Sequence, residues 1–78
     1  MTRNTLTAPA TGALILERLP AVKARVGLSR SEIYRRISAG TFPAQCKLSE
    51  RASAWDARAV DRWILDRIAA RDAKAAAA

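Results

Sequence analysis

A chain of 78 residues supports one small domain, whose core has to be built from few large side chains. It carries 14 lysines and arginines against 7 acidic residues, and the resulting net charge of +7 favours a polyanionic partner. There is no histidine, and Cys46 is the single cysteine, which excludes an internal disulfide and a zinc site of Cys and His ligands. We expect neither an enzyme nor a bound cofactor, metal or small-molecule substrate.

No stretch of the sequence has the pattern of a membrane span or a secretory signal. The longest apolar run, residues 12–16, is too short to cross a bilayer. No charged, apolar and small-residue regions follow one another in the order of a signal peptide. We therefore expect a cytoplasmic protein with no membrane partner.

The two ends of the chain lack the patterns of packed elements. Residues 1–12 contain Thr, Ala, Asn and Pro without a period, which is typical of a disordered arm. Residues 73–78 are nearly all alanine and form either a frayed helix end or a disordered tail. The folded domain is therefore expected over residues 13–72, and its first residues, 13–19, fit either a short strand or an extended lead-in.

The first predicted helix runs from Pro20 to Val26. Proline is favoured as a first helical residue because its missing N–H would have no partner there. Val22 and Val26 lie four residues apart and so share one face. Gly27 suits the left-handed conformation that commonly ends a helix.

The second predicted helix, residues 30–39, has a stronger start signal. Ser29 and Glu32 have the spacing of a capping box, in which the serine oxygen accepts from the Glu32 amide and the glutamate reaches back to the Ser29 amide. Gly40 is expected to end this helix. Two short helices joined across residues 27–29 predict a helix-turn-helix.

A hairpin is predicted directly after the second helix. Weak two-residue alternation indicates strands at residues 46–48 and 53–55, with a turn at residues 49–52. A two-stranded hairpin that follows a helix-turn-helix is called a wing. The predicted fold class is therefore α+β and mostly α, a small winged helix-turn-helix of three helices and a two-stranded wing.

The third predicted helix covers residues 57–71, with Asp56 as its cap. Leu65 lies off its apolar stripe and either packs on the hairpin or is exposed. The residues of the stripe, which are expected to face the core at helical spacing, are Val60, Trp63, Ile64 and Ile68.

The outward face of the second helix is predicted to bind DNA. Arg30 and Arg35 are expected to read base edges, whereas Arg36 is rotated toward the flank and suits a phosphate. A merely solvated face is the alternative for Arg35 and Arg36, and a partly buried ring is the alternative for Tyr34. The predicted DNA-binding residues are Ser29, Arg30, Ser31, Tyr34, Arg35 and Arg36 on the helix and Lys47, Ser49, Arg51 and Ser53 on the wing.

The stretch "RLPAVKARVGLSRSEIYRRISAGTFPAQCKLSERASAWDARAVDRWILDRIAAR" resembles the AlpA-type phage and prophage regulators. These are small winged helix-turn-helix proteins related to excisionases and to the MerR DNA-binding domain. The resemblance covers about Leu16 to Arg71. The motif elements that carry it are residues 27–31, Ile33-Tyr34, residues 40–43, Lys47-Leu48, Arg51-Ala52, Trp55 and Trp63-Ile64.

The resemblance implies sequence-specific binding of double-stranded DNA by a transcriptional regulator of a phage, prophage or other mobile element. The alternative it implies is an excisionase, a recombination directionality factor that bends attachment-site DNA and contacts an integrase. A bacterial, nucleoid-associated location follows from either role. Ser49 and Ala54 stand where the family usually has glycine, and Glu32 stands where it often has threonine, so the wing tip and the target sequence are expected to differ.

Partner proteins are a further expectation. A module this small buries limited DNA surface, which predicts several copies on repeated sites or a partner such as an integrase or recombinase. The alternative class is a protein-interaction module, for example an antitoxin, whose third helix docks on a partner through Leu65.

Overall fold

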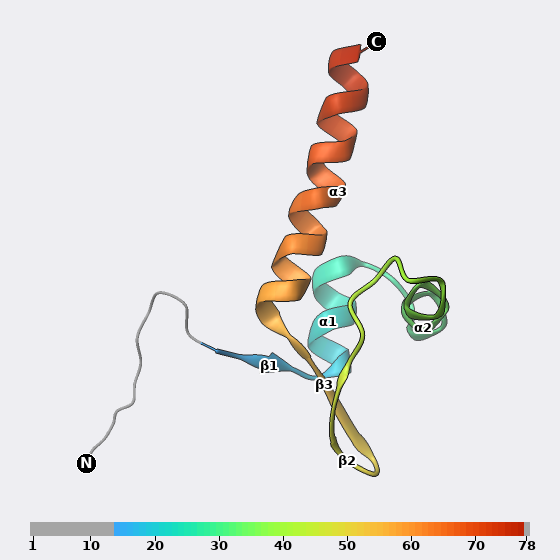
Figure 1. The fold of residues 1–78 in the computed structure, drawn as a ribbon, viewed down its shortest axis with the longest axis vertical. Helices are drawn as coiled ribbons and strands as arrows, with labels where there is room; N and C mark the ends of the chain where they lie inside the picture. Colours follow the sequence, from blue (N-terminus) through green and yellow to red (C-terminus); the bar gives the residue numbers. More distant parts are fainter. Residues whose placement is uncertain (1–13, 78) are drawn as a thin grey trace, which may run out of the picture.

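The computed structural model describes residues 14–77, so the predicted arm at residues 1–12 lies outside the described part of the chain. The three helices and the hairpin confirm the predicted fold class, a small and mostly helical α+β fold of winged-helix-like form (Figure 1). The elements are, in chain order, β1 (Leu16–Glu17), α1 (Leu19–Val26), α2 (Arg30–Ala39), β2 (Cys46–Ser49), β3 (Ala52–Asp56) and α3 (Ala57–Ala77).

A three-stranded antiparallel sheet in the order β1-β3-β2 organises the domain. Of the two alternatives for the start of the domain, a short strand is the one observed, because β1 pairs with the end of β3. The β2–β3 hairpin, called the wing below, has a register irregularity between Lys47 and Ser49. The paired residues are Leu16 with Asp56, Glu17 with Trp55, Cys46 with Ala54, Lys47 with Ser53 and Ser49 with Ala52.

Glycines end both short helices, as the sequence predicts. Gly27 has φ 71° after α1 and Gly40 has φ 79° after α2, both in the left-handed region that only glycine enters freely. Pro20 lies in the first turn of α1, which begins one residue earlier than expected. Residues 27–29 therefore connect α1 and α2 with a tight, fixed turn.

The capping-box prediction at the start of α2 is half right. The Ser29 hydroxyl accepts a hydrogen bond from the Glu32 amide at 3.2 Å, as expected for an N-cap. The Glu32 carboxylate, however, pairs with the side chains of Arg35 and Arg36 rather than returning to the Ser29 amide. Two guanidinium groups one turn further along the helix attract this carboxylate more strongly than one backbone N–H.

The core is a single cluster around Trp55, whose side chain is only 1% exposed. The Trp55 indole N–H donates to the Pro43 carbonyl at 3.1 Å, and the Trp63 indole N–H donates to the Thr41 carbonyl at 2.8 Å. The loop after α2 is thus fixed by both tryptophans. The buried members of this cluster are Val22, Ile33, Phe42, Trp55 and Val60, and Leu19, Val26, Leu28, Tyr34, Ile37, Trp63 and Ile64 pack against them.

The core is smaller than the sequence predicts. Ile68, expected on the buried stripe, is 43% exposed, and Leu48, beside the register irregularity, is 50% exposed. The third helix continues to Ala77 instead of ending at Arg71, so the alanine-rich residues 73–77 are helical. The C-terminal part of α3 extends away from the rest of the domain (Figure 1), in agreement with the exposure of Ile68.

Candidate functional site

The exposed face of α2 presents arginines that share one acidic partner. The Arg35 side chain is 70% exposed, and its guanidinium donates to the Glu32 carboxylate. The Nε atom of Arg36 lies 3.7 Å from the same carboxylate and is buried without a hydrogen-bond partner in the described part of the chain. Ser31 is exposed on this helix as well. Arg35 therefore faces solvent and Arg36 lies at the flank, as predicted.

A stack of side chains joins Arg30 to the core. The guanidinium carbon of Arg30 lies 5.3 Å from the centre of the Tyr34 ring, within the range of a cation–π contact. The Tyr34 ring in turn meets Trp55 edge-on, with the ring centres 6.1 Å apart and the planes at 68°. Tyr34 is partly buried, which is the alternative raised for it. Because the core fixes Tyr34, it also orients Arg30.

A hollow of about 290 Å³ lies between the start of α2 and the wing. It brings Arg30 and Tyr34 of α2 together with Arg51 and Ser53 of the wing. Arg18, just before α1, also lines this hollow, and its Nε donates to the Ser53 carbonyl at 3.1 Å. The hollow contains one acidic residue, Glu50. The combined basic site formed by these elements is called the α2–wing hollow below.

Arg18 was not among the predicted site residues. Its only signal in the sequence is its place directly before the first helix, where a basic residue is unremarkable. It reaches the site because β1 pairs with β3 and sets the start of α1 beside the wing. That contact joins residues 35 positions apart, so no local pattern reveals it.

Other predicted residues lie outside the α2–wing hollow. Lys47 and Ser49 are exposed on β2, and Lys47 is paired with Ser53 across the wing. The Ser49 hydroxyl accepts a hydrogen bond from the Arg51 amide at 3.4 Å and so helps to shape the wing tip. Arg35 and Arg36 do not line the hollow. The structure therefore gathers Arg30, Tyr34, Arg51 and Ser53 in the hollow and leaves Arg35 and Arg36 on α2 and Lys47 and Ser49 on β2 outside it.

Several arginines outside this site serve the fold. Arg25 of α1 pairs with Glu17 of β1 and Asp61 of α3, which ties three elements together. Hydrogen bonds to the Asp61 and Glu17 carboxylates raise the pKa of Arg25. This arginine is therefore engaged in the structure and does not belong to the candidate site.

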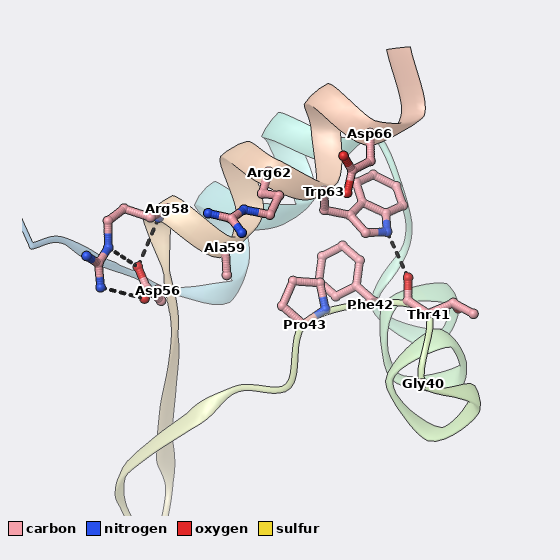
Figure 2. Close-up of a pocket in the computed structure, with 10 residues that line it drawn as sticks. All are labelled: Gly40, Thr41, Phe42, Pro43, Asp56, Arg58, Ala59, Arg62, Trp63 and Asp66. Atoms are coloured by element: carbon pink, nitrogen blue, oxygen red, sulfur yellow. Dashed lines mark hydrogen bonds and ion pairs between the residues drawn. The ribbon is translucent and has the colours of Figure 1, made fainter. Parts of the chain in front are cut away.

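A second and larger hollow, of about 650 Å³, lies between the loop after α2 and α3 (Figure 2). Phe42 and Trp63 meet edge-on in it, with ring centres 5.0 Å apart.

Asp56, which also lines this hollow, caps α3 by accepting a hydrogen bond from the Arg58 amide at 2.9 Å. Its carboxylate also accepts hydrogen bonds from the Arg58 guanidinium. These hydrogen bonds lower the pKa of Asp56. A carboxylate held in its ionised form is a structural cap rather than a proton donor at neutral pH.

Two short helices joined by a glycine turn, with a basic wing beside the second, define a small winged-helix-like protein. Residues 15–68 match the family described as prophage CP4-57 regulatory protein (AlpA), and the chain belongs to this family. The predicted resemblance is thus confirmed. The match includes α1, α2, the wing and the first half of α3, and therefore the whole candidate site.

A phage protein is similar to this chain over 54 residues. The chain is 44% identical over 54 residues to the uncharacterized protein ORF88 of Enterobacteria phage P4. The aligned segment is 69% of this chain and 61% of the phage protein, so the match spans about three-fifths of that relative. The family description is that of a prophage regulatory protein, and the relative comes from a phage. Of the helices in residues 14–77, none combines the length and apolar character needed to cross a membrane.

Proposed function

We propose that this protein is a sequence-specific double-stranded DNA-binding protein that regulates transcription in a phage, prophage or other mobile element. The observation that carries the proposal is the convergence of Arg18, Arg30 and Arg51 on the α2–wing hollow, beside the exposed arginine face of α2. The net charge of +7 and membership of a prophage regulatory family support it. Binding rather than catalysis is its role, and the bacterial nucleoid is its place of action.

In the proposed complex, α2 lies in the major groove. The exposed Arg35 reaches a guanine edge, and Ser31 faces the bases beside it. Ser29 and Arg36, at the start and flank of the helix, contact phosphates. Lys47, Ser49, Arg51 and Ser53 on the wing hold the adjacent backbone.

For Arg30 we propose a different role from the one expected from the sequence. The sequence interpretation has Arg30 read bases together with Arg35. Its guanidinium instead lies over the Tyr34 ring and lines the hollow beside the wing. This position favours a phosphate contact, so we assign base reading to Arg35.

Selection of bound sites from random duplex DNA tests the proposal. It is run with the full chain at about 150 mM salt, where weak charge-driven binding is suppressed. A sharp motif that loses one specified base pair in the Arg35→Ala variant supports sequence reading by α2. Sequence-blind binding that disappears with salt overturns it, because the arginines then supply charge alone.

Exposed apolar side chains on α3 favour a second role in which the protein contacts another protein while on DNA. Leu65 is 64% exposed there, and Ile68 lies one turn further along. This surface suits a second copy on a repeated site, or an integrase if the protein is an excisionase. Duplexes with the selected site at different positions distinguish the roles, because an excisionase that bends DNA changes their gel mobility according to the position of the bend.

A further inference from the structure

The α2–wing hollow has the composition of an anion site. Arg18 comes from the segment before α1, Arg30 from the first turn of α2 and Arg51 from the wing tip, and all three line it. Within residues 14–77 none of them makes an ion pair, so their charges are available to a ligand. We propose that this hollow holds one phosphate of the DNA backbone and that Arg18 is its innermost ligand. The inference rests on the proposed DNA-binding function and names a contact and a residue that the function alone does not assign.

The position of Arg18 is fixed before any ligand binds. Its Nε donates to the Ser53 carbonyl at 3.1 Å, which joins the start of α1 to β3. That bond occupies Nε and leaves the two terminal nitrogens of the guanidinium for another acceptor. Two parallel N–H groups match the spacing of two phosphate oxygens. A preorganised guanidinium also loses less side-chain freedom on binding than a flexible one.

Arg30 and the start of α2 complete the site from the other side. The Tyr34 ring orients the Arg30 guanidinium, and Tyr34 is itself held against Trp55. The Ser29 hydroxyl accepts a hydrogen bond from the Glu32 amide. The Ser29 carbonyl accepts the first helical hydrogen bond, from the Ile33 amide at 3.0 Å. Arg30, which lines the hollow, lies in the first turn of α2, where the backbone amides lack partners within the helix and favour an anion.

The volume of the hollow and the presence of Glu50 both bear on whether a phosphate can bind there. A volume of about 290 Å³ is roughly ten times the share of one water molecule in the liquid, enough for a phosphate with some of its sugar. Glu50 also lines the hollow and repels an anion there. Removing the charge of Glu50 should therefore tighten DNA binding, whereas removing an arginine should weaken it. The direction of each change in affinity tests the inference.

The primary test compares the salt dependence of duplex binding for the full-length protein and two variants. Arg18→Gln removes one charge from the hollow, and Arg71→Gln removes one from the projecting part of α3. Loss of one phosphate contact should weaken binding by roughly 5–20-fold and reduce the slope of log K against log salt by about 0.9. We expect this from Arg18→Gln and a much smaller change from Arg71→Gln. Equal slopes and affinities for the two variants overturn the inference.

Two more variants guard against a loss of folding in Arg18→Gln, which also loses the bond to Ser53. Arg51→Gln should reduce the slope in the same way, and Glu50→Gln should tighten binding at every salt concentration. Thermal melts identify any variant that does not fold. If Arg51→Gln and Glu50→Gln both leave binding unchanged, the hollow is not a phosphate site. If the unmodified protein does not bind duplex DNA at all, the proposed function fails as well, which separates the two outcomes.

A single neutral phosphate locates the contact. On a selected site, one backbone phosphate at a time is replaced by an uncharged methylphosphonate. At the phosphate held by the hollow, the replacement should weaken the unmodified protein strongly and Arg18→Gln clearly less, because Arg30 and Arg51 still line the hollow in that variant. If the free-energy losses from Arg18→Gln and from the methylphosphonate are additive at every phosphate, Arg18 contributes only to the overall positive potential of the protein. That result contradicts the inference.

Discussion

The Glu32 carboxylate accepts a hydrogen bond from Arg35, one turn further along the exposed face of α2. The side chain proposed to read a base is therefore paired within its own helix when DNA is absent. An exposed ion pair three residues apart stabilises a helix by only about 0.2–0.5 kcal/mol. A base edge or a phosphate can displace the carboxylate at that small cost, so Glu32 restrains Arg35 without blocking it.

Glu32→Gln should release this restraint. We expect affinity for unselected duplex DNA to rise by about 3–10-fold, because one negative charge leaves the DNA-facing surface. Preference for the selected site should fall, since a freed Arg35 contacts phosphates more readily. Competition binding with selected and scrambled duplexes measures both effects. Asp72→Asn, the same charge change near the far end of α3, is the control, and equal gains in the two variants would refute a local role for Glu32.

Arg35→Ala should weaken binding to the selected site by roughly 1–3 kcal/mol and relax the preference at one base pair. The reason is that the exposed guanidinium of Arg35 can form two hydrogen bonds to a guanine edge. Arg36→Ala, at the flank of the same helix, should instead weaken all duplexes alike. Binding to a panel of single-base variants of the site distinguishes the patterns. A uniform loss for Arg35→Ala assigns that residue to a phosphate.

Short-range chemistry made much of the fold predictable. Gly27 and Gly40 end their helices and Ser29 begins one because each effect acts within a few residues. The partner of Glu32 was predicted wrongly because two arginine side chains compete with one backbone amide for the same carboxylate. The sequence shows which groups can bind the Glu32 carboxylate, but it does not show which of them binds it most strongly.

Contacts between distant segments could not be predicted in the same way. Arg18 belongs to the candidate site only because β1 pairs with β3, a result of tertiary structure. Ile68 continues the apolar spacing of α3, yet the rest of the domain ends before it and leaves it half exposed. Helical periodicity identifies a face but does not show whether another element covers it.

Ser29→Ala should lower the free energy of unfolding by about 1 kcal/mol, because the Glu32 amide loses its capping acceptor. Urea denaturation followed by circular dichroism measures this. Ser31→Ala, in the first turn of the same helix, is the control and should change stability much less. If both variants have the stability of the unmodified chain, Ser29 is not a significant cap.

The ionised Asp56 carboxylate should account for part of the loss of folding stability at low pH. Hydrogen bonds from Arg58 lower its folded pKa below the unfolded value of about 3.9. The ionised carboxylate therefore stabilises the folded state above that unfolded pKa, and the contribution is lost as the pH falls through the folded pKa. Asp56→Asn should make the protein less stable at neutral pH and flatten the loss of stability as the pH falls from neutral to below the unfolded pKa. Melting curves across this range test it, with Asp66→Asn as the control; equal profiles for the two variants would contradict the assignment.

Leu65→Glu should separate partner binding from DNA binding. Leu65 is exposed on the projecting α3 and contributes little to the core, so the change in folding stability should stay within about 0.5 kcal/mol. Affinity for a single site should be retained, because the α2–wing hollow and the exposed face of α2 do not include Leu65. Cooperative binding to a duplex with two sites should be lost if α3 contacts a second copy. Titrations of one-site and two-site duplexes measure the difference.

Arg71→Gln is the matched control, because it changes the charge of α3 by the same amount without altering the apolar face. Retained cooperativity in Leu65→Glu would mean that copies do not meet through this face, and the same variant would then be tested for integrase binding. A collapse of single-site affinity would place Leu65 in the DNA contact or the fold. Because Leu65 is exposed and lies outside the α2–wing hollow, single-site affinity and cooperativity measured together distinguish a protein contact from a contribution to the fold or to DNA binding.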